Sequence, residues 1–169
     1  MHIHQILFIA CWAGQTAEAK RLIAKGAPVD WQNWDGEAPL HGALTNCHTE
    51  IVMLLLENKC NINVTDKSGY TPLILAAQRN HMDTVRALVE AGCDITIRDG
   101  YTKKTAAEWA KQKGYHAIAE YLTNEAPRVR FHSSARDESG QLHRVKGRCK
   151  RALNRDLKEI AGFDDHMLH

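Results

Sequence analysis

Ten histidines and five cysteines are the residues of this 169-residue chain whose side chains could bind a metal or act as nucleophiles. Zinc is held by imidazole nitrogens and thiolates at short, fixed spacings, and a nucleophilic cysteine needs a base beside it. The chain has no Cys-x-x-Cys pair, no His-Glu-x-x-His motif, no glycine-rich phosphate loop and no Gly-x-Ser-x-Gly motif. We therefore expect no enzymatic activity, no metal site and no cofactor.

Two clusters at the ends of the chain keep a metal-binding alternative open. His2 and His4 lie near the first residue, and a second cluster lies near the last. Two histidines and two carboxylates do not select a particular metal, and the ends of a chain commonly fray. We interpret both clusters as solvated ends. The second cluster consists of Asp164, Asp165, His166 and His169.

The cysteines are odd in number and widely spaced, which is typical of reduced thiols rather than of a disulfide framework. No aliphatic run approaches the ~20 residues of a membrane-spanning helix. No Lys or Arg precedes Lys20, although a secretory signal peptide begins with positive charge. We expect a protein of the cytoplasm or of the nucleus. The cysteines are Cys11, Cys47, Cys60, Cys93 and Cys149.

An internal repeat sets the positions of many of these residues. The segment Gly36-Glu-Ala-Pro-Leu40 recurs 33 residues later as Gly69-Tyr-Thr-Pro-Leu73. Near Lys103 and Lys104 the spacing becomes 34, which indicates one inserted residue. A period of this length is typical of stacked repeats. The pattern predicts four units, at about 1–32, 33–65, 66–98 and 99–125.

Two segments give the repeat a family resemblance. Thr71-Pro-Leu-Ile-Leu-Ala-Ala77 and Ala38-Pro-Leu-His-Gly-Ala43 resemble the T-P-L-H-x-A signature of ankyrin repeats. The last unit, which has Thr105 but no Pro-Leu pair, looks like a terminal ankyrin repeat. The resemblance implies an all-α solenoid of helix-turn-helix units joined by β-hairpin-like loops. It also implies that His41 ties adjacent hairpin loops together by hydrogen bonds.

The period also predicts local structure. Gly36 and Gly69 fall at hairpin turns that require positive φ, and Pro39 and Pro72 fall in the first helical turn, where a missing N–H costs nothing. One helix pair cannot bury its apolar face alone, so stacking of neighbouring pairs supplies the core. The predicted apolar stripe of one second helix is Thr84, Val85, Leu88 and Val89.

The resemblance implies a binding surface on the hairpin tips and on the exposed face of the first helices. Three of the four tryptophans fall there, and exposed aromatic residues are typical interface anchors, although Trp12 has half-burial in the core as an alternative. Acidic residues near the tryptophans favour a basic or apolar partner segment, with a caged methyl-lysine as a minor alternative. The candidate residues are Trp12, Trp31, Trp34, Asp35, Glu37, Asn46, Lys67, Tyr70, Arg79, Arg98, Tyr101 and Lys103.

The charge distribution separates a body from a tail. Residues 1–125 hold 12 basic and 14 acidic side chains, whereas residues 126–169 hold 10 basic and 6 acidic ones. Apolar residues at helical spacing predict a helix over about 142–161. This basic tail has four interpretations: a cap on the last repeat, a nuclear-import signal, a contact with nucleic acid or anionic membrane, or a partner-binding helix. Its basic cluster is Arg144, Lys146, Arg148, Lys150 and Arg151.

These patterns favour a non-enzymatic protein-protein interaction module, acting as an adaptor, scaffold or inhibitor. Apolar residues make up 44% of the chain and charged residues 25%, which is globular composition and argues against wholesale disorder. The alternative is a nuclear or nucleic-acid-associated factor that works through the basic tail. We expect a monomer with a protein partner, whose identity the repeat pattern does not specify.

Overall fold

The computed structural model describes residues 2–125, and the predictions made for residues 126–169 and for the basic tail lie outside them. The described part contains eight α-helices, ends in a π-helical turn and contains no strand. This architecture confirms the predicted all-α repeat solenoid. The elements are α1 (Ile3–Trp12), α2 (Thr16–Ala24), α3 (Pro39–Thr45), α4 (Thr49–Glu57), α5 (Pro72–Gln78), α6 (Met82–Glu90), α7 (Ala106–Gln112), α8 (His116–Glu120) and η1 (Tyr121–Glu125).

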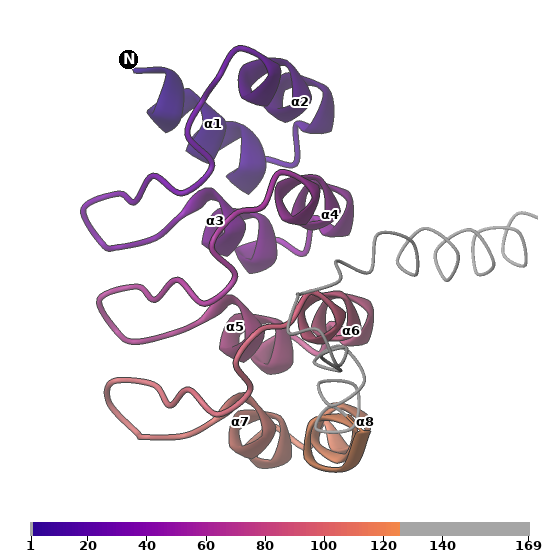
Figure 1. Ribbon diagram of the computed structural model, residues 1–169. Coiled ribbons are helices and arrows are strands. Elements are labelled where there is room, and N and C mark those ends of the chain that lie inside the picture. The colour runs from indigo at the N-terminus through magenta and orange to yellow at the C-terminus, as the bar shows by residue number, and fades with distance from the viewer. Residues whose placement is uncertain (1, 126–169) are drawn as a thin grey trace, which may run out of the picture. The chain divides into compact units, whose positions relative to one another are not determined.

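The helices form two rows (Figure 1). Helices α1, α3, α5 and α7 pack successively against one another in the inner row, and α2, α4, α6 and α8 do so in the outer row. Three loops project from the inner row: the first hairpin joins α2 to α3, the second joins α4 to α5, and the third joins α6 to α7 (Figure 1). Each helix pair therefore shares its core with its neighbours, as a stacked repeat requires.

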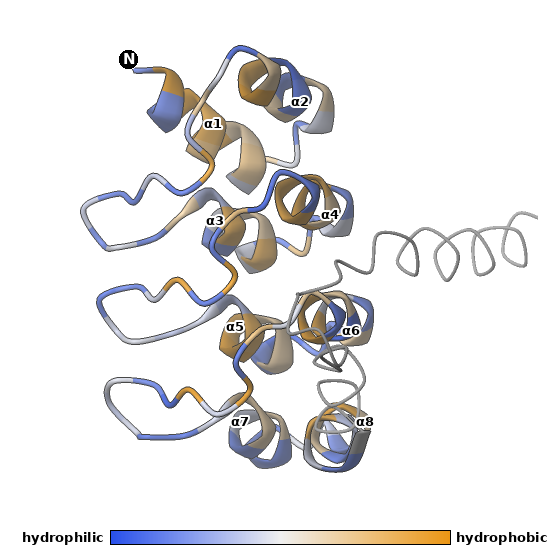
Figure 2. Cartoon of the chain, viewed as in Figure 1, coloured by the Kyte–Doolittle hydropathy of each residue, from blue (hydrophilic) through white to orange (hydrophobic). Residues whose placement is uncertain are grey.

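The hydrophobic core is one cluster of buried residues from the helices of both rows. Figure 2 shows that each helix carries hydrophobic as well as hydrophilic residues. Leu55 of α4 and Leu88 of α6, one period apart, are both fully buried. The predicted stripe of α6 is buried along its whole length, since Thr84, Val85 and Val89 are each at most 1% exposed. The helical spacing of the apolar residues therefore identified the core face of α6.

The inner helices begin as the sequence predicts. Pro39 and Pro72 occupy the first turns of α3 and α5. Thr71 Oγ1 accepts a hydrogen bond from Ile74 N (3.2 Å). At α7 the cap is reciprocal: Thr105 Oγ1 accepts from Glu108 N (3.3 Å), and Glu108 Oε2 accepts from Thr105 N (2.7 Å). These contacts satisfy backbone N–H groups that a helix start otherwise leaves unpaired.

Glycine is required at the hairpin turns for two reasons. Gly36 and Gly69 both have φ +77°, a conformation that a Cβ disfavours. A Cβ on Gly69 would also clash with the backbone N of Gly100 in the third hairpin. Neighbouring hairpins therefore approach each other closely at these turns.

The third hairpin is one residue longer than the others. Its closing hydrogen bond runs from Asp99 N to the Lys104 carbonyl (3.0 Å), whereas the second hairpin closes from Asp66 N to the Tyr70 carbonyl (3.2 Å). Lys103 takes up the extra residue at φ +56°. The inserted residue predicted near Lys103 and Lys104 is thus confirmed.

Among residues 2–125, no helix has both the length and the apolar character needed to cross a membrane.

Candidate protein-binding face

A buried histidine joins the first two hairpins. Ala38 N donates to His41 Nδ1 (3.1 Å), so Nε2 carries the proton and donates to the Tyr70 carbonyl (3.0 Å). His41 is fully buried, and this burial lowers the pKa of its imidazole, although the bond to Tyr70 opposes the shift. The neutral ring therefore provides the tie between hairpins that the resemblance implied.

A buried carboxylate organises the third hairpin. Asp99 Oδ2 accepts from Thr102 Oγ1 (2.6 Å), Lys104 N (3.0 Å) and Trp109 Nε1 (2.9 Å), and Oδ1 accepts from Tyr101 N (2.9 Å) and Thr102 N (2.6 Å). Burial alone would raise the pKa of Asp99, but these hydrogen bonds outweigh it and hold the pKa well below its ordinary value. The ionised side chain fixes the hairpin on α7.

Backbone and amide hydrogen bonds connect successive hairpins into one surface. Lys67 N donates to the Asp35 carbonyl (2.9 Å), and Gly100 N donates to the Ser68 carbonyl (2.8 Å). The Gln32 amide adds a bond to the Thr65 carbonyl (3.0 Å). The tips are therefore held at fixed positions, and little conformational freedom remains to be lost on binding.

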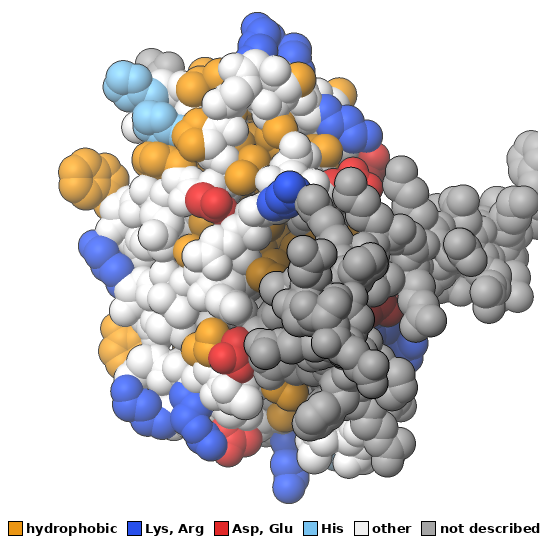
Figure 3. Space-filling model, in the orientation of Figure 1, with side chains coloured by type: hydrophobic (Ala, Val, Ile, Leu, Met, Phe, Trp, Pro, Cys, Tyr) orange, Lys and Arg blue, Asp and Glu red, His pale blue; other side chains and the backbone are white. Residues whose placement is uncertain are grey.

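Exposed hydrophobic side chains concentrate on this surface. Trp34 is 90% exposed and Tyr101 76%, both at hairpin tips, while Trp12 (51%) and Ile9 (46%) lie on α1. These four are the exposed large hydrophobic residues of the described range. Figure 3 shows hydrophobic and basic side chains alternating along the edge that the hairpins form. The face has the aromatic composition of an interaction surface.

Trp31 differs from the other predicted tryptophans. Its indole is half-buried, and its ring packs 4.6 Å from the His4 ring and edge-on to Phe8 at 6.4 Å. Trp31 was predicted together with Trp34 as an anchor of the binding surface, but it is half-buried because the start of α1 reaches the base of the first hairpin. Trp31 therefore lies at the base of the first hairpin, against α1, and not at the hairpin tip.

Three further predicted residues stabilise the face from within. Asn46 Nδ2 donates to the Trp12 carbonyl (2.7 Å). Arg98 donates to the Lys103 carbonyl (2.6 Å) and pairs with Glu108 (3.1 Å). The ring of Tyr70 lies edge-on to Trp109 with centroids 6.1 Å apart.

The remaining predicted residues divide by exposure. Asp35, Lys67, Arg79 and Lys103 are exposed. Glu37 is half-buried and accepts a hydrogen bond from Asn33 Nδ2 (2.9 Å). The tip residues Trp34, Asp35, Lys67, Tyr101 and Lys103 are therefore the predicted ones whose side chains are most open to a partner.

Of the four cysteines of the described range, Cys11, Cys60 and Cys93 are buried and Cys47 is half-buried. Burial raises the pKa of Cys11 and of Cys60 to about 12, with smaller contributions from neighbouring groups. A thiol with such a pKa is protonated at neutral pH and a poor nucleophile. Among residues 2–125 there is also no group of three or more His, Cys, Asp or Glu side chains arranged to hold a metal ion.

Sequence reasoning missed the residues that shape the hairpins. Asn33, Asp66 and Asp99 each open a hairpin and accept two or more backbone N–H groups through the side chain. Their 33-residue spacing was visible, since each is one period from the next. Asx side chains that bond the backbone two residues on are a known turn device, so this signal could have been found.

Known proteins share the repeat. A family model described as ankyrin repeats (3 copies) matches residues 7–99 and 67–137. The protein named E3 ubiquitin-protein ligase XBAT33 of Arabidopsis thaliana is 33% identical over 119 residues, which cover 66% of this chain and 23% of that protein. A probable E3 ubiquitin-protein ligase of Oryza sativa subsp. japonica, XBOS33, is 32% identical over 136 residues, which cover 79% of this chain and 25% of that protein.

A putative ankyrin repeat protein of Rickettsia felis is 34% identical over 89 residues, which cover 52% of this chain and 23% of that protein. The chain spans about a quarter of the length of these relatives. The family model covers more than half of the chain and coincides with the stacked helix pairs and hairpins described above. The chain belongs to the ankyrin-repeat family.

Proposed function

We propose that this chain is a non-enzymatic adaptor, scaffold or inhibitor that holds an extended peptide or loop of a partner protein across its hairpin tips and inner helices. Ankyrin repeats indicate a protein-protein interaction module. The observation that carries the finer proposal is the confinement of exposed large hydrophobic side chains to this face. Trp34 and Tyr101 stand on tips, and Ile9 and Trp12 on α1. Burial of such aromatic anchors dominates the affinity of many interfaces.

The proposal is tested by affinity purification from a cell extract, followed by mass spectrometry. Trp34→Ala with Tyr101→Ala should remove the partners recovered by the wild-type chain, because both side chains are exposed and their loss should leave the fold intact. The matched control is Glu57→Ala with Glu90→Ala, two exposed positions on the outer helices α4 and α6. Equal partner recovery by both double variants would contradict the proposal.

The alternative function, a nucleic-acid-associated or nuclear factor, depends on the basic tail and stays a prediction. Phosphate binding by several basic residues weakens steeply as salt rises. A full-chain variant with Arg148, Lys150 and Arg151 replaced by Gln should lose RNA or DNA binding if the tail acts in this way. Our proposal for the location remains cytoplasmic or nuclear, and it is supported by the odd number and wide spacing of the cysteines in the sequence.

A further inference from the structure

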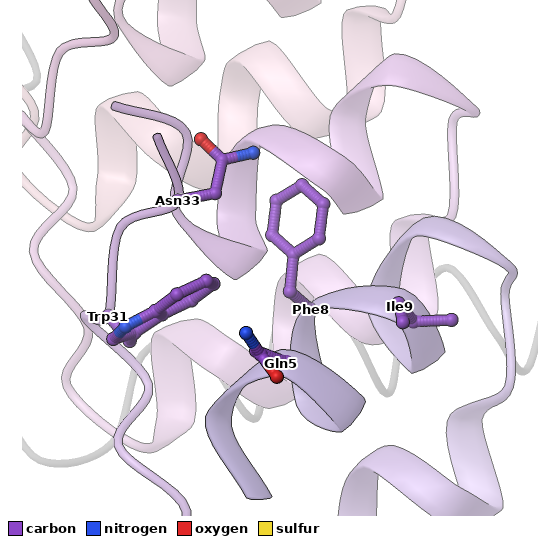
Figure 4. A pocket seen from close by; sticks show the side chains of 5 residues that line it. All are labelled: Gln5, Phe8, Ile9, Trp31 and Asn33. Atoms are coloured by element: carbon purple, nitrogen blue, oxygen red, sulfur yellow. The ribbon is translucent and has the colours of Figure 1, made fainter. Parts of the chain in front are cut away.

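A hollow lies between α1 and the base of the first hairpin (Figure 4). It is lined by Gln5, Phe8 and Ile9 from α1 and by Trp31 and Asn33 from the hairpin, and its volume is about 310 Å³. In Figure 4, Trp31 stands on one side and Phe8 and Ile9 on the other. This volume is at the lower end of the range for small-molecule sites, so the hollow suits one long side chain.

The walls of the hollow are apolar and aromatic, and they are held in place. His4 and Phe8 both contact the ring of Trp31, with centroids at 4.6 and 6.4 Å. Because contacts on two sides already fix the indole, little side-chain entropy is lost when a ligand binds to it. The face of a tryptophan ring attracts cations, and the methylene stem of a basic side chain packs well on apolar surface such as Ile9.

A carboxylate is hydrogen-bonded to one of the residues that line the hollow. Glu37 Oε2 is 2.9 Å from the amide of Asn33, which lines the hollow. Within residues 2–125, neither Glu37 nor the exposed Asp35 forms an ion pair. Glu37 therefore places a negative charge next to the hollow, and none of the ion pairs among residues 2–125 involves it.

Neither α1 nor the first hairpin after Lys25 contains a Lys or Arg residue. Between residues 2 and 58, Lys20, Arg21 and Lys25 are the Lys and Arg residues, and they belong to α2 or to the residue that follows it, in the outer row. Lys20 pairs with Glu50 (3.5 Å), and Arg21 pairs with Glu18. An acidic partner segment would therefore meet no Lys or Arg on α1 or on this part of the first hairpin. A basic segment would meet the Glu37 carboxylate.

We propose that the hollow binds one lysine or arginine side chain of the partner segment, with its stem on Phe8 and Ile9 and its cation toward the Trp31 ring and the Glu37 carboxylate. This inference rests on the proposed peptide-binding function and names the chemistry of one anchor. Further along the face, Lys67 and Lys103 present the opposite charge. The charge pattern therefore gives the bound segment a direction, with its basic residue at the first hairpin.

The test uses the full-length, ¹⁵N-labelled chain and a set of capped synthetic peptides. Each is about nine residues long, which spans about 30 Å when extended, and carries lysine, arginine, norleucine or glutamate at the centre of one neutral Ser/Ala sequence. The indole N–H signal of Trp31 is followed by NMR during titration. The lysine and arginine peptides should shift this signal until the site is saturated. The norleucine peptide should bind about 3- to 10-fold more weakly than the lysine peptide.

Glu37→Gln keeps an acceptor for Asn33 but removes the charge. This change should lower the affinity for the lysine peptide about 3- to 10-fold and leave the affinity for the norleucine peptide unchanged. The matched control is Glu57→Gln, at an exposed position on the outer helix α4. This variant should leave the affinities for both peptides unchanged. Trp31→Phe removes the indole reporter, so its titration is followed through the backbone amide signals of Phe8 and Ile9, which also line the hollow. Binding of the lysine peptide should weaken although an apolar wall is kept, because phenylalanine attracts cations less strongly.

Three outcomes would overturn the inference. The first is equal affinity for the norleucine and lysine peptides, which would make the hollow a purely apolar site. The second is a Trp31 signal that does not move at about 5 mM peptide, a concentration at which millimolar affinity is detectable. The third is a shift of the Trp31 signal, without peptide, on replacing Arg148, Lys150 and Arg151 by Gln, which would make the basic tail the occupant. If partners are still lost on Trp34→Ala with Tyr101→Ala, the proposed function stands even when this inference fails.

Discussion

The first and third hairpins are fastened to the stack by different chemistry. His41 is neutral, bonds Ala38 at the end of the first hairpin and reaches across to the Tyr70 carbonyl of the next repeat. Asp99 is ionised, and all its partners belong to the third hairpin or to α7 behind it. One side chain links repeats, whereas the other makes a single repeat rigid.

The difference follows from position in the stack. The first hairpin has a neighbouring hairpin to which a tie can run, whereas the third is the last hairpin of the described range and is one residue longer. A longer loop has more backbone N–H groups to satisfy, and a buried carboxylate with several lone pairs can accept many of them. The comparison teaches that equivalent hairpins can be kept rigid by contacts between repeats or by contacts within one repeat.

The largest effect is expected from Asp99→Ala. The change leaves the N–H groups of Lys104 and Trp109 without acceptors in a buried site, which should lower the free energy of unfolding by about 3–4 kcal/mol. Urea denaturation followed by circular dichroism measures it. Asp66→Ala is the matched variant, because Asp66 holds the same position in the second hairpin with two backbone bonds, and it should cost about 1–2 kcal/mol. A larger loss from Asp66→Ala would contradict the comparison.

His41→Ile should have a smaller but distinct effect. Ile74 occupies the equivalent position one repeat later and is fully buried, so isoleucine fits this site in the period. The variant leaves Ala38 N and the Tyr70 carbonyl unpaired and should cost about 2 kcal/mol in the same urea experiment. His116→Ala, at an exposed position on α8, is the control with a change within about 0.5 kcal/mol. An equally small loss for His41→Ile would show that the tie contributes little.

The pH dependence of stability should separate the two fastenings. The pKa of His41 is below its ordinary 6.5, so its contribution is complete above pH 6.5 and is lost as the pH falls through the folded-state value. The pKa of Asp99 is below its ordinary 3.8, so its contribution is complete above that value and is lost only under stronger acid. In the wild-type chain, the urea midpoint should therefore fall below pH 6.5 because of His41 and further below about pH 4 because of Asp99. His41→Ile should remove the first part of this pH dependence, and Asp99→Asn should remove the second. Identical profiles for the two variants would count against these assignments.

The smallest effect on stability is expected from the tip of the first hairpin. Trp34 is 90% exposed, so Trp34→Ala should change the free energy of unfolding by no more than about 0.5 kcal/mol. Trp31→Ala removes the contacts with His4 and Phe8 and should cost about 1–2 kcal/mol. Thermal unfolding of both variants tests the contrast. A greater loss from Trp34→Ala would mean that the tip contributes to the stack.

The repeat made the helices and the core predictable. A 33-residue period, prolines in the first helical turn and helical spacing of apolar residues depend on local geometry, which each unit repeats. The buried stripe of α6 and the extra residue near Lys103 were both predicted in this way. The positions open to a partner were predicted in part. Trp34 and Tyr101 lie at hairpin tips, which project from the stack and leave their side chains exposed.

Tertiary structure alone decided which candidate side chains face a partner. Trp31 and Trp34 are three residues apart on one hairpin, yet one packs on α1 and the other stands in solvent. Arg98 carries a charge like that of Lys67, but its guanidinium bonds the Lys103 carbonyl of its own hairpin and pairs with Glu108 of α7. Sequence spacing specifies the helix or loop on which a residue lies. Burial and pairing depend on the neighbouring repeat, which is about 30 residues away in the chain and adjacent only in the folded stack.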